Sequence, residues 1–76
     1  MAMEHYLIRA TIIPEIVKMI EKEYHLPERE ALKAFYMSAT GASLADDATG
    51  LYGQSPLFIF SLYRQETEEN YHGRSL

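Results

Sequence analysis

Glu21 and His25 are the pair of side chains in this 76-residue sequence whose types and spacing come nearest to a metal site. Four residues apart on a helix, they would place a carboxylate and an imidazole on one side. A zinc site needs three or four protein ligands, and no third ligand is evident nearby. We therefore expect His25 to be a surface or helix-end histidine, and we predict no metal site.

Oxygen ligands for a divalent cation could come from Asp46, Asp47 and Thr49. A calcium loop of the EF-hand kind needs carboxylates at alternating positions and a closing glutamate, and the residues that follow do not provide them. Gly50 and Gly53 stand before a helix start, as in an anion-binding loop, but no strand precedes them and no lysine follows. We interpret the acids as solvated loop residues and the two glycines as a hinge.

Nucleophilic catalysis lacks its usual arrangement of residues. No serine lies in a Gly-x-Ser-x-Gly turn, and helix capping accounts for at least two of the serines, Ser43 and Ser55. The chain has no cysteine, which excludes disulfides, thiol catalysis and thiolate metal ligands. We predict that the protein is not an enzyme, that it needs no cofactor and that it has no small-molecule ligand.

The charge of the chain disfavours nucleic acid as a partner. Seven Lys and Arg against eleven Asp and Glu give a net charge of −4, and the basic residues are scattered, whereas binding to phosphates needs a local basic surface. Residues 25–39 have the look of a helix-turn-helix, although the helix after Gly41 would offer aspartates to the bases. A dimeric DNA-binding regulator of its own operon therefore remains the alternative function.

No uninterrupted apolar run approaches the roughly 18 to 20 residues that span a bilayer, and the first residues lack the basic and apolar regions of a signal peptide. We predict no membrane association and a cytoplasmic location.

The pattern along the chain predicts the elements that carry these residues: an all-α fold in one domain, residues 1–76. Apolar residues three and four apart predict a first helix over 12–25, capped by Thr11 with Pro14 in its first turn. Leu26-Pro27 ends it and starts a second helix over 27–39, which Thr40-Gly41 stops. The buried stripe of the first helix consists of Ile13, Ile16, Val17, Ile20 and Tyr24.

The second half of the chain predicts a short helical turn near 43–48, capped by Ser43, and a third main helix over 55–70 that begins at Ser55-Pro56. A strand over 57–63 stays open as an alternative, because short apolar runs suit both structures. Residues 1–10 could extend the first helix, form an arm or order on a partner. Glu66, Glu68 and Glu69 lie at the negative end of the last helix, which predicts fraying and a mobile tail over 70–76.

Aromatic residues are numerous for so short a chain, with six tyrosines and three phenylalanines. Phe35, Tyr36 and Met37 are consecutive and cannot all face one core, and the same holds for residues 57–60. Leftover apolar surface on a small protein marks a contact site. We predict a protein interaction module that binds itself or another protein, with Tyr36, Tyr52, Phe58 and Phe60 as candidate contact residues.

Several segments also resemble a group of short bacterial helical proteins of uncharacterised function. The likeness covers nearly the whole chain and is most distinctive in Phe35-Tyr36-x-Ser38 and in Leu51-Tyr52-x-x-Ser55-Pro56. Some similar small proteins are encoded beside toxin-like enzymes, including ADP-ribosyltransferase-like ones. The resemblance therefore implies an accessory or antitoxin-like role, and it supplies no site residues.

Overall fold

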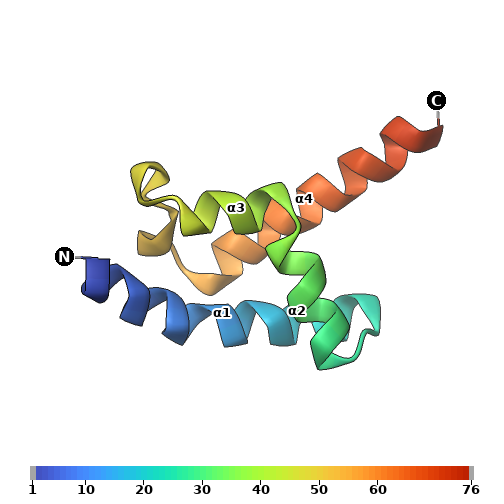
Figure 1. The fold of residues 1–76 in the computed structure, drawn as a ribbon. Helices are drawn as coiled ribbons and strands as arrows, with labels where there is room; N and C mark the ends of the chain where they lie inside the picture. The colour runs from blue at the N-terminus through green and yellow to red at the C-terminus, as the bar shows by residue number, and fades with distance from the viewer. Residues whose placement is uncertain (1, 76) are drawn as a thin grey trace.

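The computed structural model describes the backbone of residues 2–75 and the side chains of residues 7–69, and every regular element in this part of the chain is helical. Figure 1 shows α1 along one side of a bundle, α3 and α4 on the other, and α2 closing one end. The last turns of α4 extend beyond the other helices. The elements are α1 (Ala2–Tyr24), α2 (Glu28–Tyr36), α3 (Ala39–Ala45), the 3-10 turns η1 (Asp47–Thr49) and η2 (Leu51–Gly53), and α4 (Pro56–Ser75).

The prediction of a small all-helical bundle is confirmed, with four α-helices where three helices and a turn were expected. The α4 helix includes residues 57–63, so the strand alternative is wrong. Ser55 caps this helix as predicted, since its hydroxyl oxygen accepts a hydrogen bond from the Phe58 amide at 3.1 Å. The α4 helix continues to Ser75, five residues past its predicted end, and the predicted mobility of residues 70–76 stays a prediction.

The first helix begins about ten residues earlier than predicted. Pro14 lies inside α1, and Thr11, the predicted cap, is a helical residue whose hydroxyl donates to the Leu7 carbonyl at 2.9 Å. Because proline removes one helical hydrogen bond, such a position needs compensation from packing. The residues on both sides of Pro14 provide it, since Ile12 and Ile16 are buried in the core and Arg9 binds α3.

The turn between α1 and α2 ends the first helix where Leu26-Pro27 predicted. His25 takes a left-handed conformation with φ of 55°, and the Leu26 amide donates to the Glu21 carbonyl at 3.2 Å. This pairing is the long hydrogen bond of a Schellman motif, in which the left-handed position usually holds glycine. Pro27 then serves as the N-cap residue of α2.

The predicted second helix is divided in two. The chain leaves the helix after Tyr36 and starts α3 at Ala39, because Ser38 accepts a hydrogen bond from the Gly41 amide at 2.9 Å and donates one to the Phe35 carbonyl at 2.5 Å. Gly41, predicted to stop a helix, lies inside α3, where a Cβ would overlap the Phe35 carbonyl oxygen. The expected turn at 43–48 is therefore wrong in its bounds, and Ser43 is helical rather than a cap.

The core forms where all four helices and η2 meet. Ile16, Val17 and Ile20 of the predicted stripe are buried, while Ile13 and Tyr24 pack at its edge. The side chains that are fully buried are Phe35, Ile16, Ile20, Leu44 and Ile59. This core fixes α3 above α1 and against α4, which sets the geometry of the surfaces described next.

Candidate interaction surfaces

The α3 helix has only seven residues, and a carboxylate from α4 caps its amino end. Glu66 accepts hydrogen bonds from the amide of Ala39 at 2.7 Å, the amide of Thr40 at 2.9 Å and the hydroxyl of Thr40 at 2.8 Å. These are amides that a helix start leaves without a helical partner. A negative charge there also interacts favourably with the helix dipole.

The pKa of Glu66 reflects this arrangement. Partial burial on its own would raise the pKa, but the hydrogen bonds from Ala39 and Thr40 stabilise the charged form and outweigh burial, so the pKa lies below its usual value. Glu66 is therefore ionised at neutral pH and holds α4 to α3.

The carboxyl end of α3 is held by a cation from α1. Nε of Arg9 donates to the Leu44 carbonyl at 2.9 Å, and Nη2 donates to the Ala45 carbonyl at 3.3 Å and pairs with Asp47. The guanidinium also lies over the ring of Tyr52, 5.8 Å from its centroid. Arg9 thus satisfies carbonyls that a helix end leaves free, and α3 is bound at both ends by opposite charges from distant helices.

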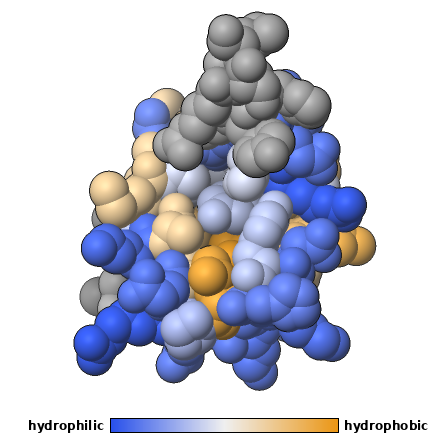
Figure 2. All heavy atoms as spheres, turned by 90° about the vertical axis from the view of Figure 1, so that its right-hand side faces the viewer, coloured by the Kyte–Doolittle hydropathy of each residue, from blue (hydrophilic) through white to orange (hydrophobic). Residues whose placement is uncertain are grey.

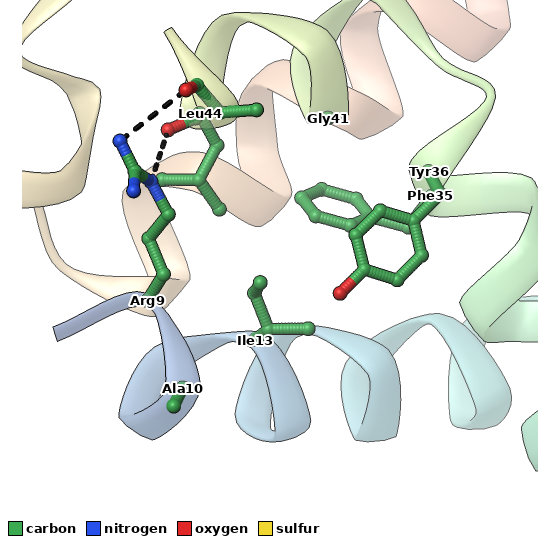
Figure 3. Close-up of a pocket in the computed structure, with 8 residues that line it drawn as sticks. Arg9, Ala10, Ile13, Phe35, Tyr36, Gly41 and Leu44 are labelled. Carbon is green, nitrogen blue, oxygen red and sulfur yellow. Dashed lines mark hydrogen bonds between the residues drawn. The ribbon is translucent and has the colours of Figure 1, made fainter. Parts of the chain in front are cut away.

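A recess opens between α1, α2 and α3 and has a volume of about 240 Å³. Its walls are mainly apolar, with Ala10 and Ile13 from α1, Phe35 and Tyr36 from α2, and Leu44 from α3. Figure 3 shows Ile13 pointing from α1 into this space and the ring of Tyr36 beside that of Phe35. Arg9 lines the side of the recess away from Tyr36. We call this hollow the Tyr36 recess.

A second hollow of about 430 Å³ lies on the opposite face of α3, against α4. Its lining includes Ala39 and Ser43 from α3, Leu51 from η2, and Leu62, Glu66 and Glu69 from α4. Residues 39 and 43 lie about 160 to 200° around the helix from residue 41, which lines the Tyr36 recess. We call this second hollow the acidic cleft.

The four predicted contact residues differ in their exposure. Tyr36 is 57% exposed at the recess, and Phe58 is 46% exposed on α4. Tyr52 is half-buried beside Arg9, and Phe60 is only 9% exposed in the core. Phe60 is therefore part of the core rather than of an exposed surface, and the role of all four residues in binding stays a prediction.

Large apolar side chains are exposed elsewhere too. Figure 2 views the bundle from the right-hand side of Figure 1 and shows hydrophilic side chains around a small apolar area. On α2, Leu32 and Tyr36 are four residues apart and therefore share one side, with Met37 directly after them. The exposed large apolar residues in the described part of the chain are Leu7, Ile8, Leu32, Tyr36, Met37, Leu57 and Phe58.

The remaining candidates for chemistry do not assemble into a site within the described residues. His25 leaves the helix of Glu21 through its left-handed turn. Asp46 caps η1 by accepting from the Ala48 amide at 3.0 Å, and Asp47 pairs with Arg9. Gly50 has a φ of 68°, a left-handed conformation that glycine favours, and the predicted hinge at Gly50 and Gly53 stays a prediction. No group of three or more His, Asp or Glu that could hold a metal ion is found among side chains 7–69.

The contacts of Glu66 and Arg9 with α3 have no signal in the local sequence. Their partners are 26 and more residues away in the chain, and most of those partners are backbone groups, so no local spacing signals the contact. Within the described residues, no helix is both long and apolar enough to cross a lipid bilayer. Comparisons with protein-family models, curated proteins and solved structures find no match to this chain.

Proposed function

We propose that this protein is a non-enzymatic interaction module that binds a partner polypeptide through the Tyr36 recess. The observation that carries the proposal is an exposed tyrosine on the rim of an open, mainly apolar hollow. Tyrosine is enriched among residues that dominate binding energy, and such residues pair with pockets on the other partner. A partner would place an apolar side chain between Tyr36, Ile13 and Leu44.

The size of the recess supports a side chain as the occupant. About 240 Å³ lies below the roughly 300 to 1,000 Å³ of typical small-molecule sites. Leu32 and Met37, exposed on and beside α2, extend the apolar surface beyond the recess. Extra burial would also help a chain of 76 residues, since a domain of this size buries only about 60% of its unfolded surface.

Such binding fits an accessory or antitoxin-like subunit in the cytoplasm. A subunit of this kind acts by binding its partner protein. The chain resembles short bacterial helical proteins of uncharacterised function, and some similar small proteins are encoded beside toxin-like enzymes, which favours this role. The partner is then another protein, or a second copy of the chain in a homo-oligomer.

The test is purification of the tagged protein from the cells that make it, followed by mass spectrometry and light scattering. We expect a stoichiometric second protein or a defined oligomer. Tyr36→Ala should abolish that association, whereas Leu57→Ala, which removes an exposed apolar side chain from α4 outside the recess, should preserve it. Circular dichroism of both variants checks that they are folded. A monomer that returns alone, or an association that Tyr36→Ala leaves intact, would refute the proposal.

A further inference from the structure

The acidic cleft has an apolar floor and two helical walls. Leu51 is buried beneath it and Leu62 is half-buried along it. Phe58, one turn before Leu62 on the same side of α4, remains 46% exposed. The apolar surface of the cleft therefore continues along α4 to the exposed ring of Phe58, which is not part of the core.

The wall of the cleft that α3 forms carries small side chains. Ala39 and Ser43 line the cleft from α3 and are four residues apart, so they share one side of that helix. On α4, residues 58, 62, 65 and 69 follow the four-and-three spacing of a helix-packing seam. Small side chains on one wall and a regular seam on the other are features that suit packing against a helix.

The charges of the cleft have one sign. Its charged lining residues are Glu66 and Glu69, both acidic. The nearest cation along α4, Arg64, points to Glu23 of α1 and to Glu68, 3.8 Å from each carboxylate, and is not part of the lining. Within the described residues, no ion pair neutralises Glu69.

We propose that the acidic cleft binds a basic amphipathic helix of a partner protein. The apolar side of that helix would pack on Leu62 and Phe58, and a lysine or arginine would face Glu69. A second copy of this chain is a poor occupant, because its net charge is also −4 and like charges across an interface are unfavourable. Nucleic acid would bring phosphates to the same acidic surface.

This inference concerns a different face of α3 from the Tyr36 recess, so each can fail without the other. The probes are two 14-residue helical peptides with the same leucine pattern, one with lysine and the other with glutamate at every polar position. Each is titrated into isotopically labelled protein, and amide chemical shifts are recorded. We expect the lysine peptide alone to bind, with shifts concentrated at Ala39, Ser43, Leu62 and Glu69, and binding weakened by salt.

Two charge reversals provide the matched comparison. Glu69→Lys should weaken the lysine peptide about tenfold, because a charge in the cleft changes sign. Glu15→Lys makes the same change of net charge on the exposed surface of α1 and should alter the affinity by about twofold or less. The inference is overturned if the lysine peptide does not bind, if the glutamate peptide binds equally, if the shifts map elsewhere, or if the two variants behave alike.

Discussion

Replacing Glu66 by glutamine removes one charge from α4 while keeping the length of the side chain, so it isolates the effect of the carboxylate on α3. In the wild type this carboxylate accepts three hydrogen bonds of 2.7 to 2.9 Å at the amino end of α3. The amide oxygen of glutamine can retain part of them, but without charge assistance. The interaction with the helix dipole, about 0.3 to 1 kcal/mol, is lost as well.

We expect Glu66→Gln to lower the free energy of unfolding by about 1 kcal/mol, and Glu66→Ala, which also removes the cap itself, by about 2 to 3 kcal/mol. For a domain of this size, 1 kcal/mol corresponds to about 4 to 8 °C in Tm. Urea unfolding followed by circular dichroism measures both variants. The control is Glu68→Gln, which removes a carboxylate from the same helix whose ion pair with Arg64 is exposed and contributes about 0.5 kcal/mol or less.

The stabilising effect of the Glu66 carboxylate should also depend on pH in a defined direction. The pKa of Glu66 is lower in the folded protein than its usual value, so its ionised form stabilises the fold above the unfolded-state pKa of about 4.3. This contribution is lost as the pH falls through the folded pKa. The deficit of Glu66→Gln should therefore be complete at pH 6 to 7 and shrink below about pH 4. A deficit that is absent at pH 7, or that stays constant down to pH 2, would refute this account of Glu66.

Three further substitutions test the local geometry by thermal or urea unfolding. Gly41→Ala should lower the free energy of unfolding by about 3 kcal/mol or more, or prevent folding, because the added Cβ would overlap the Phe35 carbonyl oxygen. The control is Gly53→Ala, whose Cβ would lie in open space and whose effect should be near zero. Equal effects of the two substitutions would contradict this packing. His25→Gly should stabilise by about 0.5 to 1 kcal/mol, since it relieves a left-handed conformation; destabilisation would contradict this reading. Arg9→Lys should cost about 1 kcal/mol, because lysine cannot bind two carbonyls in a fork; an unchanged Tm would show that the fork is unimportant.

Local signals predicted the helical elements wherever the deciding contacts are close in sequence. Ser55 and Pro56 start α4 through a bond to an amide three residues on, and Leu26-Pro27 ends α1 through its own turn. The stripe of Ile16, Val17 and Ile20 faces the core because helical spacing alone puts these residues on one side.

Long-range contacts explain the errors. Thr40 and Gly41 have the composition of a helix end, yet both lie in the first turn of α3. Glu66, 26 residues away from Thr40, accepts a hydrogen bond from the Thr40 amide, and Ser38 accepts one from the Gly41 amide. The same glutamate was expected to destabilise the end of its own helix, whereas it stabilises the start of another. Pro14 suggested a first turn, but packing on both sides keeps it inside α1.

For the candidate contact residues too, local spacing predicts some features and long-range contacts set the others. Once 57–63 is known to be helical, Phe58 and Phe60 must lie on different sides, since two residues span about 200°, and the structure exposes the first and buries the second. The Tyr36 recess requires three helices to meet, so no pattern within one segment of the sequence could reveal it.

Photocrosslinking from position 36 tests whether the Tyr36 recess binds a partner. A photoreactive phenylalanine analogue replaces Tyr36 at the rim of the recess, or Leu57 on α4 as the control, and both proteins are irradiated in the cells that make them. We expect one defined crosslinked species from position 36 and little from position 57. Crosslinks of equal yield from the two positions, or none from position 36 in a sample that retains its partner, would contradict binding at the recess.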